Sequence, residues 1–200
     1  MEHIEIIAAV IAGILMFTAQ FVYMIQIWRR TIQPNHLAWF GFALMLGSAL
    51  VSQIIQEGWN WSHLGLVVST IDCFLIFAIA QIKKQYNYKH FDWIYFGLGM
   101  LCAAVYILSK DAWITTIFSV AADLVLAIPM LIKAFRDPAS ERSPAWLLAS
   151  FSWIITLGIG YNESLVNWVV PIYLLSFNTL MIYLGYFYKK STIVKSKLEA

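Results

Sequence analysis

The sequence predicts an all-α membrane protein with seven transmembrane helices. The 200-residue chain is 61% hydrophobic and only 12% charged, which is about half the charged fraction of an ordinary soluble domain. Its apolar residues gather in seven stretches close to the roughly 20 residues that cross a bilayer. The second half of the chain also repeats features of the first half, which indicates an internal duplication.

The expected helices follow one another along the whole chain. The first, residues 6–28, is preceded by the acidic flank MEHIE and is too long for the apolar core of a cleaved signal peptide, so we expect it to remain in the protein. The other six segments are long and apolar enough to span a bilayer, or nearly so: 37–56, 62–82, 92–109, 112–133, 145–161 and 166–187.

Basic residues predict the orientation, because Lys and Arg favour short cytoplasmic loops. Seven spans put one basic residue, Lys110, on the side of the amino terminus. The other twelve fall on the opposite side: Arg29, Arg30, Lys83, Lys84, Lys89, Lys133, Arg136, Arg142, Lys189, Lys190, Lys195 and Lys197. We therefore expect an integral protein of the plasma (inner) membrane, with the amino terminus outside and the carboxyl terminus in the cytoplasm.

The internal repeat predicts two parallel three-helix units. Asp72 and Asn178 are 106 positions apart, as are the pairs Lys83-Lys84 and Lys189-Lys190, and the segments 25–34 and 129–138 align at an offset of 104. Two three-span units fused directly would lie upside down relative to each other in the membrane. A fourth helix between them, with no counterpart in the repeat, would give both units the same orientation. The expected organisation is a first repeat at 1–88, linker helix 4 at 89–110, a second repeat at 111–190 and a cytoplasmic tail at 191–200.

These features resemble the PQ-loop superfamily, which includes the SWEET sugar transporters, lysosomal amino-acid exporters and KDEL receptors. The family's Pro-Gln pair corresponds to Ile25-Gln26, which keeps Gln, and to Pro129-Met130, which keeps Pro. In both copies a basic loop follows, then a Pro, then a Trp that opens the next helix. Asp72 and Asn178 look like the asparagine pair of the SWEET site, and of the four SWEET hinge prolines only Pro129 clearly matches. The resemblance covers residues 6–190 and implies the three-plus-one-plus-three fold.

Two matched positions are the first candidates for substrate binding. Asp72 lies mid-segment, where an aspartate costs about 2.5–3.5 kcal/mol to insert, and intramembrane carboxylates usually face the bundle interior or water. Asn178 could serve as interhelical glue, but its partnership with Asp72 favours a binding role. We expect the two side chains to face each other across one cavity near mid-membrane.

Asp123 is a third candidate for substrate binding, and two interpretations of it remain open. Its counterpart in the first copy is Ala19, so the shared fold does not need a charge there. One interpretation is a proton site, a cation site or a contact to one end of the substrate. The other is a structural hydrogen bond to a hydroxyl such as that of Ser119 or Ser176.

Four further residues are weaker candidates. Trp153 and Tyr23 could contact substrate, although packing is the commoner role of such residues. Gln26 and Pro129, toward the cytoplasmic ends of their helices, are candidates for gating and hinge motion. The remaining tryptophans fall near segment ends, where interfacial aromatic belts form: Trp28, Trp39, Trp59, Trp61, Trp93, Trp113, Trp146 and Trp168.

The expected function is alternating-access transport, facilitated or proton-coupled, of a small polar solute such as a sugar, amine or amino acid. The alternative is a membrane receptor of the KDEL-receptor type, which would be expected to carry a cationic pocket that the distribution of Lys and Arg does not favour. A retinal protein would need a lysine in the middle of segment 7, and we reject this class because Lys189 and Lys190 lie at the cytoplasmic end of that segment. The chain lacks the enzyme motifs HExxH and GxSxG, so we expect no enzyme activity.

Partners follow from the same composition. We expect a small polar solute and membrane lipid, with protons and a second copy of the chain as further candidates. A net charge of +2 gives no support to nucleic-acid binding. The four histidines show no ligand spacing and both cysteines lie in apolar stretches, so we expect neither a metal nor a cofactor.

Overall fold

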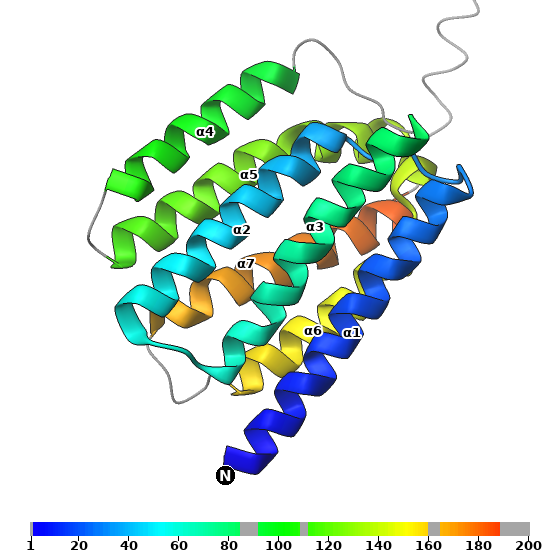
Figure 1. Ribbon diagram of the computed structural model, residues 1–200. Coiled ribbons are helices and arrows are strands. Elements are labelled where there is room, and N and C mark those ends of the chain that lie inside the picture. Colours follow the sequence, from blue (N-terminus) through cyan, green and yellow to red (C-terminus); the bar gives the residue numbers. More distant parts are fainter. Residues whose placement is uncertain (1, 85–91, 109–111, 160–164, 189–200) are drawn as a thin grey trace, which may run out of the picture.

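The computed structural model describes residues 2–84, 92–108, 112–159 and 165–188, and these residues form helices without a β-strand. Seven α-helices follow in chain order (Figure 1): α1 (Glu2–Trp28), α2 (His36–Glu57), α3 (Leu64–Lys83), α4 (Asp92–Leu108), α5 (Ala112–Arg136), α6 (Ala145–Ile159) and α7 (Leu165–Ile182). The 3-10 turns η1 (Trp61–His63) and η2 (Pro138–Glu141) precede α3 and α6, and the π-helical turn η4 (Tyr183–Phe187) extends α7. The all-helical prediction is confirmed for the described residues, and the expected helix ends agree within about five residues.

Five of the seven helices are long and apolar enough to cross a membrane. Together with the adjoining turns η1 and η4, they give the candidate spans His3–Trp28, His36–Ile55, Trp61–Lys83, Thr116–Arg136 and Trp168–Phe187, whereas α6 is apolar but shorter. Large apolar side chains also point outward, among them Ile4 at 73%, Ile55 at 78% and Ile82 at 74% exposure. A surface of this kind suits lipid better than water, so the structure is compatible with an integral membrane protein.

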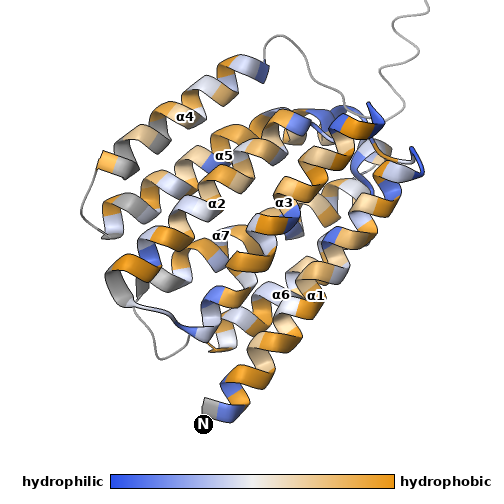
Figure 2. Cartoon of the chain, viewed as in Figure 1, coloured by the Kyte–Doolittle hydropathy of each residue, from blue (hydrophilic) through white to orange (hydrophobic). Residues whose placement is uncertain are grey.

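Hydrophilic residues gather at one end of the bundle, where α1, α3, α5 and α7 end and α2 and α6 begin (Figure 2). We call it the basic end, because the described Lys and Arg lie there: Arg29, Arg30, Lys83, Lys84, Lys133, Arg136 and Arg142. Lys110, the Lys189-Lys190 pair, the tail 191–200 and the expected domain boundaries lie outside the described residues.

Helix packing follows a regular scheme. α3 packs against both α1 and α2, and α7 packs against both α5 and α6. Across the bundle, α1 packs on α6 and α2 packs on α5, and the Ser152 hydroxyl donates to the Ala12 carbonyl at 2.8 Å between α6 and α1. α4 lies at one edge, against α5 and α2 (Figure 1).

Asn35 and Leu126 fix α4 in this position. Asn35 caps α2 by accepting from the Ala38 amide, and its Nδ2 donates to Asp92 Oδ2 at 2.9 Å, in the first turn of α4. Leu126 of α5 fits between two glycines, since a Cβ at Gly41 of α2 or at Gly99 of α4 would come within 2.7 Å of its side chain. The Leu126 side chain therefore cannot retreat from one helix without striking the other.

A leucine at position 99 should consequently weaken the packing of α4. We expect Gly99→Leu to cost about 1–3 kcal/mol, as overpacked cores do, and to lower the melting temperature of the detergent-solubilised protein. Gly97→Leu is the matched control, because the same helix is exposed there and a Cβ meets no atom within 4 Å. Equal melting temperatures for the two variants would contradict this packing.

Candidate functional site

A small cavity lies in the centre of the bundle, with a volume of about 40 Å³. It is lined by residues from six helices, with α4 contributing none of them: Met16, Gln20, Trp39, Phe42, Leu46, Ser69, Cys73, Asp123, Trp146, Ala149, Trp153, Leu174, Phe177 and Asn178. This volume holds a few water molecules and is far below the roughly 300–1,000 Å³ of typical ligand pockets. The bundle is therefore closed around its central polar groups.

Asp123 of α5 supplies the carboxylate of the cavity. Its side chain is 5% exposed, and Tyr173 of α7 donates a hydrogen bond to its Oδ2 at 2.7 Å. Its Oδ1 is buried without a hydrogen-bond partner among the described residues. The structural alternative named Ser119 or Ser176 as the donor; the hydroxyl that bonds Asp123 belongs to Tyr173, while Ser176 donates to the Ile172 carbonyl.

Asn178 and Asp72 occupy different surroundings. Asn178 lines the cavity and is 5% exposed, whereas Asp72 is 1% exposed and is not among the lining residues. Ser69 and Cys73, on the same helix as Asp72, do line the cavity. The Oδ2 of Asp72 is buried without a partner among the described residues. We expected Asp72 and Asn178 to face each other across one cavity. In this conformation Asn178 lines the cavity and Asp72 does not.

An aromatic layer separates the cavity from the basic end. The rings of Trp39 and Trp146 stack with centroids 6.2 Å apart and planes 17° apart. Tyr23 contacts both, at 4.9 and 5.6 Å, while Phe42 and Phe177 pack on the cavity side of the pair. The prediction of an interfacial belt is wrong for Trp39 and Trp146, which are 2% and 4% exposed, because the first turns of α2 and α6 face each other rather than lipid.

The weaker candidates divide between the cavity and the basic end. Trp153 lines the cavity and is 2% exposed. Tyr23 is fully buried but is not a lining residue, since its ring lies against Trp39 and Trp146. Gln26 makes a long contact of 3.4 Å from its Nε2 to the Arg142 carbonyl, between the ends of α1 and α6.

Pro129 lies within α5, which continues through it, and lines a second cavity of about 380 Å³ between the connection before α2, α4, α5 and η2. Polar side chains of this second cavity already have partners: Lys133 pairs with Glu141 and Asn35 bonds Asp92. We therefore take the central cavity, whose carboxylate keeps an oxygen without a partner, as the candidate site.

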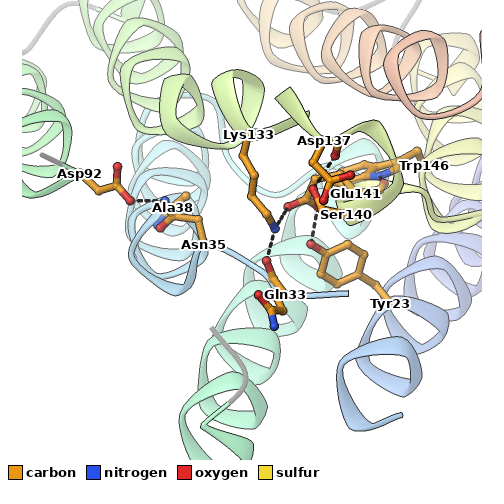
Figure 3. A network of polar contacts seen from close by, with 10 residues as sticks. All are labelled: Tyr23, Gln33, Asn35, Ala38, Asp92, Lys133, Asp137, Ser140, Glu141 and Trp146. Carbon is orange, nitrogen blue, oxygen red and sulfur yellow. Dashed lines mark hydrogen bonds and ion pairs between the residues drawn. The ribbon is translucent and has the colours of Figure 1, made fainter. Parts of the chain in front are cut away.

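A hydrogen-bonded network closes the basic end (Figure 3). Glu141 of η2 is 1% exposed, and its carboxylate accepts from Lys133 Nζ and from Tyr23 Oη, each at 2.9 Å. Lys133 also donates to the Gln33 carbonyl, and Trp146 Nε1 donates to the Glu141 carbonyl at 2.9 Å. The network joins α1, α5, α6 and the connection before α2.

Burial governs the ionisation of Glu141, which lies outside the spanning segments. Desolvation raises the pKa of its carboxyl above the ordinary 4.5, and the neighbouring Lys133 and the hydrogen bonds from Lys133 and Tyr23 lower it only in part. Burial therefore disfavours the charged form of Glu141, and its contacts with Lys133 and Tyr23 offset only part of this cost.

Sequence reasoning missed Glu141, Tyr173 and the Trp39–Trp146 pair. Glu141 lies in a polar connection, DPASERSP, where an acidic residue is ordinarily solvated. The sequence around Tyr173 does not mark it as a site residue, because its role depends on a hydrogen bond to Asp123 of another helix, α5. The tryptophans did carry one, since they are 107 positions apart in the aligned repeats.

Comparisons with protein-family models, with curated proteins and with solved structures found no match to this chain. Among the described residues, no group of three or more His, Cys, Asp or Glu side chains is arranged to hold a metal ion. The fold and site define a helical bundle with membrane-spanning character and a buried central cavity whose described lining is mostly apolar, with five aromatic rings and one carboxylate.

Removing Glu141 should destabilise the protein strongly. In Glu141→Ala, Lys133 and Tyr23 lose their acceptor, and breaking a buried ion pair costs about 3–5 kcal/mol. The double variant Glu141→Ala/Lys133→Met should recover part of this loss, because no unpaired ammonium group remains. Asp137→Ala is the control: its exposed side chain makes no capping bond, and we expect a change within about 0.5 kcal/mol. Denaturant or thermal unfolding measures all three, and a double variant no more stable than Glu141→Ala would contradict the pairing.

The raised pKa of Glu141 also predicts the direction of a pH effect. The folded protein binds a proton at Glu141 more tightly than the unfolded chain, so this stabilising contribution is complete below the ordinary value of 4.5 and is lost as pH rises through the folded-state pKa. Glu141→Gln cannot ionise. Between about pH 4 and pH 8, the melting temperature of the unaltered protein should fall relative to that of Glu141→Gln. Parallel melting curves across this range would contradict the assignment.

Proposed function

We propose that this chain is an integral membrane transporter of a small polar solute that works by alternating access. The observation that carries the proposal is the central cavity, whose described lining residues come from six helices and not from α4. A solute site shared by two helical units that can move against each other is the arrangement on which alternating access depends.

The two units are proposed to be parallel repeats of the PQ-loop type, α1–α3 and α5–α7, with α4 as linker. The packing supports this, because α3 and α7 each contact both other helices of their unit, and the units meet through α1–α6 and α2–α5. The matched residues Trp39 and Trp146 also meet at the centre. Such exchange of equivalent contacts is what a two-fold relation between parallel units produces.

The basic end is proposed to face the cytoplasm, since Lys and Arg favour that side. The aromatic layer and the Glu141–Lys133–Tyr23 network would then form the cytoplasmic gate. Opening would separate α1 from α6 and release Glu141 from Tyr23, while the outer ends of the helices close. A carboxylate-binding receptor is less well supported, because the part of the cavity lining that the structure describes contains neither Lys nor Arg.

Cys73 allows a test that does not require the solute. It lines the cavity and is 2% exposed, and the chain has only two cysteines, so Cys102→Ser leaves Cys73 as the sole thiol. Alternating access predicts that a membrane-impermeant thiosulfonate reagent modifies Cys73 when added to either side of oriented proteoliposomes. Mass spectrometry of the intact protein measures the modified fraction.

The matched control for this test is Cys73→Ser/Cys102→Ser, which must remain unmodified. Modification from one side alone would indicate a fixed vestibule, as in a receptor, and would overturn the transport proposal. Absence of modification from both sides at functional temperature would also overturn it, since the cavity would then never open.

A further inference from the structure

We propose that the central cavity binds a small primary ammonium ion, with the –NH₃⁺ group donating to Asp123 Oδ1 and the carbon atoms against aromatic rings. The inference rests on the proposed function and names the class of solute. It excludes a neutral sugar or polyol as the preferred substrate.

The first step is the state of Asp123. The side chain is 95% buried by area, lines the cavity, and accepts one hydrogen bond from Tyr173 at Oδ2. Oδ1 is buried with no donor among the described residues. A buried carboxylate that lacks a counter-charge is unfavourable unless a partner completes it, and an unfilled acceptor facing a cavity is a position for a ligand donor.

The second step is the absence of a protein cation at this place. Among the described residues, the lining includes neither Lys nor Arg, and the next basic residue along α5 is Lys133. Ten residues of helix place Lys133 about 15 Å further along the axis, where it pairs with Glu141. A cation at Asp123 therefore has to come from the solute.

The third step is the wall of the cavity. Five aromatic rings line it, those of Trp39, Phe42, Trp146, Trp153 and Phe177. Aromatic faces attract ammonium groups, most strongly when Trp supplies the ring and water is excluded, and they also accept the alkyl carbons. A sugar would instead need many hydrogen-bond partners, and besides Asp123 the described lining offers the side chains of Gln20, Ser69, Cys73 and Asn178 and the indole N–H groups of its tryptophans, of which Trp39 Nε1 is buried without a partner among the described residues.

The size of the cavity restricts the ion further. About 40 Å³ suits an ammonium group with one or two carbons in this closed conformation. A primary ammonium fits better than a quaternary one, because Oδ1 and the Asn178 amide oxygen are hydrogen-bond acceptors that an N–H group can use.

The test compares 2-aminoethanol with ethane-1,2-diol, which replaces the ammonium group by a hydroxyl. Isothermal titration of the purified full-length chain near neutral pH should show binding of 2-aminoethanol and at least about tenfold weaker binding of the diol, the ratio expected for a charge-assisted hydrogen bond. Equal binding of both, tighter binding of the diol, or no binding of 2-aminoethanol would overturn the proposal.

Two variants locate the ion. Asp123→Asn keeps an oxygen for Tyr173 but loses the charge, so 2-aminoethanol should bind at least about tenfold more weakly. Asp72→Asn makes the same change at a carboxylate outside the cavity lining, and should keep tight binding. Any other pattern overturns the assignment to Asp123. Melting curves and gel filtration establish that both variants fold. If Asp123→Asn does not fold, binding of 2-aminoethanol is compared instead between the unaltered protein and Asp123→Glu, which keeps the charge.

The thiol experiment separates the two proposals. Modification of Cys73 from both sides combined with no binding of 2-aminoethanol would leave transport in place and remove the ammonium assignment. Protection of Cys73 from the reagent by 2-aminoethanol, and not by the diol, is the result expected if both proposals hold.

Discussion

The arrangement of this bundle depends on how three buried carboxylates are satisfied among apolar helices. Water is largely excluded from such an interior, so each carboxylate needs donors or a counter-charge. Glu141 has both, through Lys133 and Tyr23. Asp123 has a single donor, Tyr173, and Asp72 has an oxygen without a partner among the described residues. The two mid-helix aspartates thus each keep a buried oxygen without a partner among the described residues, and of the two only Asp123 lines the cavity, where a ligand can reach it.

Glu141 and the aromatic layer act on the same set of helix ends. The Glu141 carbonyl accepts from Trp146, whose ring stacks on Trp39, and its carboxylate accepts from Tyr23, whose ring contacts both tryptophans. Movement of η2 would therefore disturb the polar network and the stacked rings together. Because a buried ion pair contributes little net stability once desolvation is counted, the closed end can be specific in geometry without being held too tightly to open.

The sequence was sufficient to predict the positions of the helices but not most contacts of the site, because the helices depend on local residues and the contacts depend on how distant helices pack. Helix positions follow from local hydropathy and length, so the ends of α4 and α5 could be placed closely from composition alone. Asp123 and Asn178 could be singled out because polar residues in apolar segments are conspicuous. Tyr173 and Glu141 could not, since a tyrosine and a loop glutamate are ordinary until another helix approaches them. The distinction between Asp72 and Asn178 likewise depends on helix rotation within the bundle, which a repeat offset does not encode.

The tryptophan pair has the same residue type at both matching positions of the repeat, whereas Asp123 matches an alanine, and the two cases have different consequences. Trp39 and Trp146 align in the sequence repeat and contact each other, as residues near an approximate two-fold axis would, so the rocking motion that we propose would separate them evenly. Asp123 matches Ala19, which is fully buried on α1, and its charge therefore lies on one side of the cavity only. A solute with a single cationic end would be held in one orientation by such a site, whereas a symmetric pair of amides would not distinguish its ends. Symmetry would thus serve the motion of the bundle, and the departure from symmetry at Asp123 would serve the selection and orientation of the solute.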